Sequence, residues 1–349
     1  MHLENTNNLL LRKLSNRDFD SYGVFVSLGS KNMFLHSKNI NFDTYFDIAS
    51  MGKVLVTSSL ILMSADRSML SLDDTLGIFF ADIPKDKKNI TIKQLLTHTS
   101  GIVRYDIPQD AAKLGSDAVA NFIINTPLAF EPGTKHTYSC NGMILLGYIL
   151  EKIYGKPLEK IFNEKIKQPL GYTRSKFNID IDEQNAAKCY RTENLDGLEH
   201  PWDDENIRVL KTSAGSGGQF FTLGDIKKFA DAVMEKSNIL YSKQMFDLAE
   251  KNYTNGLGEG WGLGWLFVDE NYKQTGKLFP IGSFGHCGHT GTSIFFNREK
   301  NLYVIILTNA TRFLNMSNNF KGYDYNIIEK MREDIHNEIY KELKEQGLI

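Results

Sequence analysis

Two residues near position 50 have the types and spacing of a nucleophile and its base. Ser50 and Lys53 stand three positions apart in the segment SMGK. On a helix, this spacing brings both side chains to one face. A serine hydroxyl attacks a carbonyl only when a neighbouring base takes its proton, and a lysine does this when burial or a nearby positive charge favours its neutral amine. The pair alone also fits a helix-cap serine followed by a solvated lysine, so other segments must decide.

Three further segments carry side chains that suit the same chemistry. Residues 137–141, TYSCN, precede an apolar stretch with the pattern of a buried helix. Residues 284–292, FGHCGHTGT, lead into a strand pattern. Residues 90–101, ITIKQLLTHTSG, lie between Ser50 and the other two segments. Tyrosine and histidine are side chains that transfer protons in active sites, so these segments supply candidate partners for Ser50.

With these segments in view, the chain resembles the class C β-lactamase-like serine hydrolases. This family includes class C β-lactamases, low-molecular-weight penicillin-binding proteins, D-amino-acid peptidases and family VIII esterases. The resemblance runs from about residue 22 to residue 309. Residues 50–53 are similar to the family's Ser-x-x-Lys, residues 138–140 (YSC) stand where it has Tyr-x-Asn, and residues 286–288 (HCG) stand where it has Lys-Thr-Gly or His-x-Gly. The stretches EPGTKHTYS, GWGLGW and HTGTSIFFNREKNLYVIILTN are also similar to family sequences.

The resemblance implies a role for each residue. Ser50 is expected to form an acyl-enzyme, while Lys53 takes or shuttles its proton. Tyr138 is expected to protonate the leaving group and later to activate the hydrolytic water, and Lys53 beside it would favour the phenolate form. By resemblance, the backbone amides of Ser50 and His289 form the oxyanion hole that a tetrahedral intermediate needs. Gly288 would let the strand backbone come close to the substrate.

Three positions depart from the β-lactamase pattern. His286 replaces a lysine, and an imidazole is shorter and mostly neutral near pH 7, so it is a weaker anchor for a substrate carboxylate, although it can still bond Tyr138. Cys140 replaces an asparagine and Cys287 a threonine, and a thiol is a weak donor and acceptor. Asn141 stands one position late and is expected to point elsewhere. The departures favour an ester or peptide substrate over a β-lactam.

The cysteines and histidines of these segments could also suggest a metal site. Cys140, Cys287, His286 and His289 lack the local paired spacing of structural zinc motifs, so they are interpreted as non-metal residues and no cofactor is expected. The glycine-rich residues 215–218 lack the following Lys-Ser/Thr of a phosphate loop and are expected to form a tight turn at the pocket wall.

Several other possible functional residues are interpreted as structural. His98 is interpreted as a helix-end residue. Asp203 and Asp204 match an acidic position of some esterase-like family members, but a surface loop is the favoured interpretation. Trp261 and Trp265 are expected to pack between sheet and lobe, with substrate contact as the alternative.

The elements that must position these residues show a simple order along the chain. Strand patterns occur near both ends: 22–28, 32–36, 261–268, 293–296 and 302–308. Helix patterns occupy the middle and the C-terminus: 50–65, 92–98, 142–154, 223–234, 242–251 and 328–343. The stretch 175–209 is polar and irregular.

We therefore expect an α/β (α+β) fold with two lobes, of the β-lactamase/transpeptidase-like type. An antiparallel sheet flanked by helices would come from residues 1–67 and 259–349. An inserted helical lobe would come from residues 68–258, and the active site would lie in the cleft between the two lobes.

Composition limits the expected partners and the expected cellular location of the protein. The chain has 349 residues, 42% hydrophobic and 23% charged, with a formal net charge of -2, so neither nucleic acid nor an anionic membrane is an expected partner. The three cysteines cannot form a disulfide framework and suit a reducing compartment. The N-terminal segment lacks the apolar run of a signal peptide, and no stretch approaches the ~20 apolar residues of a membrane span. The expected location is the cytoplasm.

The sequence thus predicts a hydrolase that acts on a small ester or amide through an acyl-serine. Two alternatives stay open. One is a D-alanyl-D-alanine carboxypeptidase, a D-aminopeptidase or a weak β-lactamase. The other is a non-catalytic binding protein on the same fold.

Overall fold

The computed structural model describes residues 1–103, 105–180, 182–190, 199–200, 215–270, 272, 274–313 and 325–349. The strands in these residues are β1 Tyr22–Leu28, β2 Lys31–His36, β3 Tyr45–Asp47, β4 Cys189–Tyr190, β5 Glu199–His200, β6 Phe220–Thr222, β7 Leu266–Phe267, β8 Phe284–Cys287, β9 Ser293–Asn297 and β10 Leu302–Thr308. The helices, with η marking 3-10 and π turns, are α1 Glu4–Ser15, η1 Ala49–Met51, η2 Lys53–Ser58, α2 Ser59–Asp66, α3 Leu76–Phe79, α4 Ile92–Leu96, α5 Gln109–Leu114, α6 Ser116–Asn125, α7 Cys140–Tyr154, α8 Leu158–Phe162, η3 Asn163–Lys167, α10 Leu223–Met234, α11 Lys243–Ala249 and α13 Asn326–Glu345.

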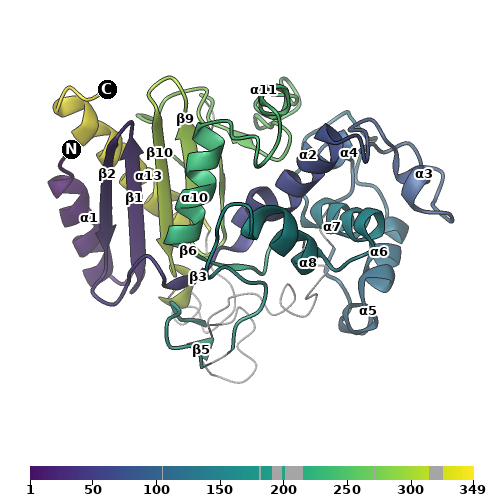
Figure 1. The fold of residues 1–349 in the computed structure, drawn as a ribbon, viewed down its shortest axis with the longest axis horizontal. Coiled ribbons are helices and arrows are strands. Elements are labelled where there is room, and N and C mark those ends of the chain that lie inside the picture. Colours follow the sequence, from purple (N-terminus) through teal and green to yellow (C-terminus); the bar gives the residue numbers. More distant parts are fainter. Residues whose placement is uncertain are drawn as a thin grey trace.

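Strands from the two ends of the chain form one antiparallel sheet. Its order is β2-β1-β10-β9-β8-β7 (Figure 1). β1 pairs with β10 along its length, with Tyr22 opposite Thr308, and both strands are rich in β-branched and aromatic residues. β8 pairs with β9, which places His286 opposite Ile294. The predicted antiparallel sheet built from both chain ends is therefore confirmed.

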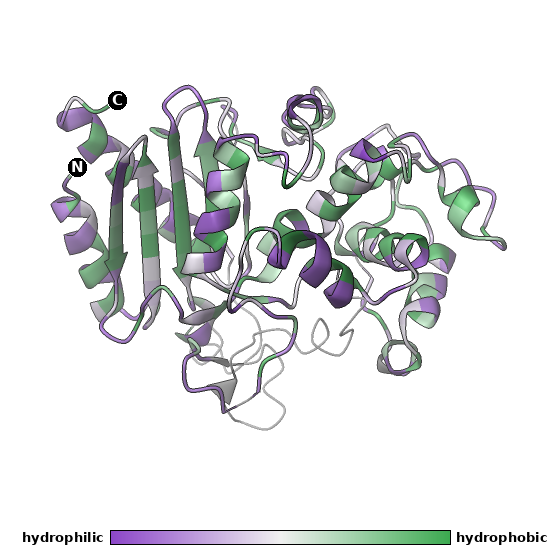
Figure 2. Ribbon diagram, in the orientation of Figure 1, coloured by the Kyte–Doolittle hydropathy of each residue, from purple (hydrophilic) through white to green (hydrophobic). Residues whose placement is uncertain are grey.

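The strand residues alternate between two hydrophobic cores, one on each face of the sheet. In β1, Val24 and Val26 belong to the core that contains α1 and α13, whereas Phe25 belongs to the core that contains α10. α10 contacts β10 and lies in front of the sheet in Figure 1, with α13 behind it. The strands are coloured largely hydrophobic in Figure 2, whereas α1 and α10 carry both colours, as expected of helices with one face on a sheet.

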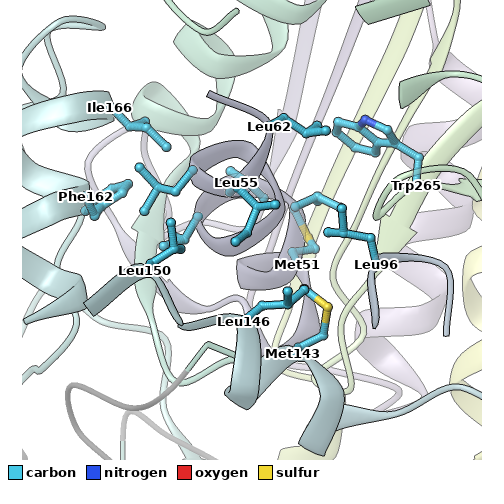
Figure 3. Packing of buried hydrophobic residues seen from close by; sticks show 14 of the residues in the cluster. Met51, Leu55, Leu62, Leu96, Met143, Leu146, Leu150, Phe162, Ile166 and Trp265 are labelled. Carbon is cyan, nitrogen blue, oxygen red and sulfur yellow. The ribbon is translucent and has the colours of Figure 1, made fainter. Parts of the chain in front are cut away.

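The helices from the middle of the chain pack around η2 and α2. Figure 3 shows Leu55 of η2 and Leu62 of α2 in a cluster with Leu146 of α7 and Phe162 of α8. Met51 belongs to the same cluster and is fully buried, although it directly follows the half-exposed Ser50. Burial of Met51 therefore anchors the segment that carries the candidate nucleophile.

Two predicted elements differ from the structure. The predicted helix 50–65 consists of three pieces, the 3-10 turn η1, the π segment η2 and the helix α2. The hydroxyl of Ser59 donates to the carbonyl of Val54 at 2.7 Å, inside this wider turn. The predicted strand 261–268 is a strand only at Leu266–Phe267, because Gly264, with φ of 89°, turns the chain within the glycine-rich segment.

Several helices were not predicted, namely α1, α3, α5, α6 and α8, and α1 shows what holds such an element in place. α1 packs against α13, and the carboxylate of Glu342 accepts hydrogen bonds from the backbone amide and the hydroxyl of Thr6, at 2.8 and 2.6 Å. The sequence of α1 is largely polar, and only a few of its residues, such as Leu10, reach the core. Hydrophobic periodicity therefore did not predict this helix. Among the described residues, no helix is both long enough and apolar enough to cross a membrane.

The division into lobes at residues 68 and 258 stays a prediction. Several elements between these positions contact the part of the chain assigned to the sheet lobe. α10 contacts β10, α7 contacts η2, and β6 pairs with β3, with Thr222 opposite Tyr45.

Candidate active site

The candidate nucleophile follows a sharp turn at the end of β3. Ala49 has φ of 45°, in the left-handed region that residues other than glycine rarely adopt. The carboxylate of Asp47 accepts a hydrogen bond from the Ala49 amide at 2.8 Å, which fixes this conformation. Ser50 therefore leaves the strand at a defined angle and is half-exposed, whereas the residues after it are buried.

Lys53 lies against Ser50 in the buried side of the turn. Its ammonium or amine nitrogen donates to Ser50 Oγ at 2.8 Å and to the carbonyl of Ser216 at 2.5 Å. The same nitrogen lies 5.0 Å from the centre of the Tyr138 ring. The Lys53 side chain is only 1% exposed. The predicted pair is thus in hydrogen-bond contact, and the base is held by a second, buried acceptor.

The glycine-rich segment forms the predicted tight turn beside this lysine. The carbonyl of Gly215 accepts a hydrogen bond from the hydroxyl of Thr57 at 2.7 Å, next to the bond between Ser216 and Lys53. A Cβ on Gly215 would lie 2.4 Å from the carbonyl oxygen of Met143 in α7. Only glycine therefore lets this turn lie close enough to α7 to present its carbonyls to η2.

Tyr138 stands immediately before α7 and beside Ser50. Ser139 caps that helix, because its hydroxyl accepts from the Gly142 amide at 3.0 Å. Burial raises the pKa of Tyr138 well above its ordinary value, and neighbouring Cys140 adds to the rise, while a hydrogen bond with Ser50 opposes it. The expectation that Lys53 would favour the phenolate is therefore wrong, because burial, the largest contribution to the pKa, favours the neutral phenol. Tyr138 is a protonated phenol at neutral pH.

His98 forms part of the wall behind Tyr138, a position that its helix-end interpretation did not anticipate. Its ring centre lies 4.7 Å from that of Tyr138 and 4.7 Å from that of Trp261. Its Nδ1 accepts from the Ser139 amide at 3.2 Å, and its φ is 54°. Burial lowers its pKa well below the ordinary value, and His136 and Lys53 lower it further.

His136 completes this wall by stacking on Trp261. Their ring centres are 5.2 Å apart, with 29° between the planes. Burial lowers the pKa of His136 to about 4, so the ring is neutral at pH 7. No spacing rule singles out His98 or His136, because their relation to Tyr138 exists only after the chain has folded. Trp261 thus belongs to the site wall, whereas Trp265 packs in the core (Figure 3).

His286 reaches the site from β8. Its Nδ1 lies 2.8 Å from the carbonyl oxygen of Cys287, and because a carbonyl only accepts, this nitrogen carries the proton. Nε2 is then an acceptor, and it is buried without a hydrogen-bond partner among the described residues. Burial and the charge of Lys53 lower the pKa of His286 to about 3. The ring centres of His286 and Tyr138 are 6.1 Å apart, and the expected hydrogen bond between them is not formed.

The two cysteines of the site have different surroundings. Cys140, the first residue of α7, is half-exposed. Cys287 is buried, its Sγ lies 3.3 Å from the hydroxyl of Tyr272, and burial raises the pKa of its thiol. Asn141 points away as expected, because its amide donates to the carbonyl of Tyr105 at 3.1 Å. Among the described residues, no group of three or more metal-binding side chains comes together.

The loop after β8 is docked onto the end of β3. The hydroxyl of Thr290 donates to the carbonyl of Asp47 at 2.7 Å, and that of Thr292 to the carbonyl of Ile48 at 3.2 Å. A Cβ on Gly288 would lie 2.1 Å from the hydroxyl oxygen of Thr292 and 2.5 Å from the carbonyl of Ile48. The absence of a side chain at Gly288 therefore brings the peptide between Gly288 and His289 up to the Ser50 turn.

Of the remaining predicted residues, the structure describes His289 but not the two aspartates. His289 is exposed and stacks on Tyr325, with ring centres 5.5 Å apart and 3° between the planes. Asp203 and Asp204 lie outside the described residues.

The comparisons with known proteins concern the family and the fold. A family model described as Beta-lactamase matches residues 16–319. Two Escherichia coli proteins, from strains O157:H7 and K12, are each named "Putative D-alanyl-D-alanine carboxypeptidase". They are 29% identical to this chain over 302 and 301 residues, which cover 76% of it and 69% of each relative. A Salmonella typhimurium protein of the same name is 25% identical over 323 residues, covering 83% of this chain and 74% of the relative.

Solved structures share the fold at lower identity. One is EstCE1, described as a hydrolase with promiscuous acyltransferase activity, with a TM-score of 0.75, 19% identity and coverage of 96% of this chain and 98% of that one. Another is an octameric penicillin-binding protein homologue from Pyrococcus abyssi, with a TM-score of 0.71, 21% identity and coverage of 99% and 78%. Because the family model spans most of the sequence, this chain belongs to the β-lactamase family and is a serine hydrolase of that family.

Proposed function

We propose that Ser50 is the nucleophile of this hydrolase and forms an acyl-enzyme with a small ester or amide. The observation that carries the proposal is the 2.8 Å hydrogen bond between Lys53 and a half-exposed Ser50. A buried amine in contact with an accessible hydroxyl is the arrangement that nucleophilic catalysis requires.

The proton steps follow from the two partners of Ser50. Lys53 acts as a base from its unprotonated form, whose amine takes the Ser50 proton as Oγ bonds to the substrate carbonyl carbon. The amides of Ser50 and His289 stabilise the resulting oxyanion. When the intermediate collapses, the bond to the leaving group breaks and the phenol of Tyr138 supplies its proton. The Lys53 ammonium then returns a proton to Tyr138. Water releases the acyl group by the same steps in reverse.

We propose an ester or peptide, rather than a β-lactam, as the preferred substrate class. His286 is neutral, so it offers a substrate carboxylate no positive charge. The thiols of Cys140 and Cys287 are weak hydrogen-bonding groups at the positions where β-lactamases bind substrate.

A second candidate is cleavage of D-alanyl peptides, because relatives at 29% identity carry that name. Turnover of short-chain p-nitrophenyl esters, compared with nitrocefin and a D-Ala-D-Ala peptide at matched enzyme concentrations, separates the classes. The ester is expected to give the highest kcat/KM. Preferred cleavage of the peptide would support the second candidate.

A fluorophosphonate probe tests the nucleophile itself, because it labels only an activated serine. Labelling of the wild type and its loss in Ser50→Ala are expected. Equal labelling of Ser50→Ala would reject Ser50. No labelling of either protein would support a non-catalytic binding role on this fold.

We further propose a cytoplasmic location. The sparse set of thiols, with Cys140 and Cys287 both unpaired, suits a reducing compartment. Fractionation of cells that express the full-length protein tests this, and recovery outside the cytoplasm would contradict it.

A further inference from the structure

A fully buried arginine lies directly behind the loop that follows β8. Arg332, on α13, is 0% exposed. Its Nη1 donates to the carbonyl of Gly288 at 2.9 Å and, more weakly, to that of Thr292 at 3.5 Å. Its Nη2 donates to the hydroxyl of Tyr325 at 2.9 Å and to the side-chain carbonyl of Gln274.

All four acceptors of this guanidinium are neutral. No carboxylate in the part of the chain that the structure describes forms an ion pair with Arg332, and its Nε is buried without a partner there. A buried charge without a counter-ion is strongly unfavourable for folding. Burial works against the charged form of Arg332, yet its pKa is raised above the ordinary value, with contributions from Cys287, Tyr325 and Tyr272. The side chain is therefore a fixed positive charge.

The guanidinium of Arg332 contacts the peptide group that follows Gly288. The carbonyl that Nη1 contacts belongs to the peptide between Gly288 and His289, whose N–H is the second donor of the proposed oxyanion hole. Tyr325, held by Nη2, stacks its ring on His289. Arg332 thus contacts this peptide directly and reaches the side chain of His289 through Tyr325.

We propose that Arg332 is a positioning residue that fixes and polarises the peptide between Gly288 and His289, and so strengthens the oxyanion hole. The inference rests on the proposed function of Ser50. A cation on the carbonyl oxygen of a peptide draws electron density from its nitrogen, which makes the N–H a stronger donor. The effect is greatest on the transition state, where the substrate oxygen carries its negative charge.

The test compares Arg332→Gln with the wild type in two measurements. The first is kcat and KM for a short-chain p-nitrophenyl ester, expressed per active site titrated with fluorophosphonate. The second is inhibition by phenylboronic acid, whose tetrahedral adduct with Ser50 places an oxygen in the oxyanion hole. We expect kcat to fall about 10- to 100-fold, less than the loss of a whole donor, with KM changed less than about threefold. The inhibition constant of the boronic acid should rise by a similar factor.

Two further variants make the result specific. Arg298→Gln is the control, because Arg298 also donates to two backbone carbonyls, those of Val233 and Met234 at the end of α10, although it is also ion-paired with Glu250. It should leave both measurements unchanged. Arg332→Lys keeps the charge but cannot reach Gly288 and Tyr325 together, and it should raise the boronic-acid constant by a smaller factor than Arg332→Gln.

The outcomes are distinct. If either Arg332 variant has the wild-type kcat and the wild-type boronic-acid constant, the inference is overturned while the role of Ser50 stands. If Arg332→Gln gives no titratable sites, Arg332→Lys decides by the same comparison. If the wild type takes up no fluorophosphonate, the proposed function itself fails, whatever the variants do.

Discussion

The histidine and tyrosine side chains around Ser50 are held neutral, and this determines which groups can move protons. His286 has a pKa of about 3 and His136 of about 4, and the pKa of Tyr138 is raised. In each case burial disfavours the charged form. In the proposed mechanism, proton transfer at neutral pH therefore runs through Lys53 and Tyr138, and the histidines shape the wall instead of titrating.

Tyr138→Phe tests the proton donor. The ring and its packing stay, while the hydroxyl is lost, so kcat should fall by about 100-fold or more. The fall should be larger for an alkyl ester than for a p-nitrophenyl ester, because p-nitrophenolate leaves without being protonated. Equal, small losses with both esters would contradict this role for Tyr138.

The neutral histidines predict the shape of the pH profile. An ordinary histidine titrates near about pH 6.5. Because the pKa of His286 is about 3, kcat/KM should show no histidine step between about pH 5.5 and 7.5. A step in this window that disappears in His286→Gln would show that His286 is ionised there and would contradict its neutral state.

At the scale of residues, the sequence predicted the side chains around Ser50 that belong to motifs. It missed His98 and His136, which form the wall behind them. Ser50, Lys53, Tyr138 and His286 are recognisable by motif, and the structure brings them together. The prediction of a Tyr138 phenolate was wrong for a physical reason. The motifs indicate that Lys53 lies near Tyr138, but they do not indicate how far the phenol is buried, and burial raises its pKa.

At the scale of elements, two turns decide whether the site exists. The turn from β3 to η1 presents Ser50, and the loop after β8 presents the peptide that follows Gly288. Thr290 and Thr292 tie the two turns together through the carbonyls of Asp47 and Ile48. The site is therefore sensitive to small displacements of either turn.

Gly288→Ala tests that sensitivity. The new Cβ would meet the Thr292 hydroxyl at 2.1 Å and the Ile48 carbonyl at 2.5 Å, so the loop must move away from Ser50. Activity should fall more than tenfold, and the free energy of unfolding should drop by about 1–3 kcal/mol, the usual range for overpacking. Both are measured on the purified variant.

Gly23→Ala in β1 is the matched control for this substitution. Its new Cβ would meet its nearest neighbour, a ring carbon of Phe34, at 3.4 Å, which is an ordinary contact. It should leave activity unchanged. Normal activity of Gly288→Ala would show that the close approach of the two turns is not required.

Elements were predicted well where periodicity was strong and less well where tertiary contacts decide. The hairpin of β1 and β2 and the strand β10 matched their patterns closely. The three-part structure of residues 49–66 did not, because nearly every residue of this segment is buried, so the apolar spacing does not distinguish a π turn from an α turn. β3 and β6 are three residues each and pair across the chain, which no local pattern reveals.

At the scale of the whole molecule, several buried histidines are neutral, and this makes the stability of the fold depend on pH. His98, His136, His286 and His336 all have lowered pKa values, chiefly because they are buried. In the unfolded chain they would bind protons below about pH 6.5. The folded state resists protonation until a lower pH, so their contribution is complete above pH 6.5 and is lost as the pH falls toward the folded-state pKa values.

His336→Leu measures this linkage away from the active site. His336 is fully buried, and its pKa is about 3. Between about pH 6 and 4, the free energy of unfolding of the wild type should fall more steeply than that of the variant, by about 1.4 kcal/mol per pH unit. Denaturant titrations at several pH values measure both slopes. Identical slopes would show that His336 is protonated in the folded protein.

The covalent intermediate on Ser50 is the central claim, and mass spectrometry tests it most directly. The wild type and Ser50→Ala are mixed in turn with a short-chain ester, a β-lactam and a D-Ala-D-Ala peptide, quenched in acid within seconds and digested. The account predicts an added acyl mass on the peptide that contains Ser50, strongest with the ester and absent in Ser50→Ala. Turnover of the ester with no acylated peptide, or the same added mass on Ser50→Ala, would contradict it.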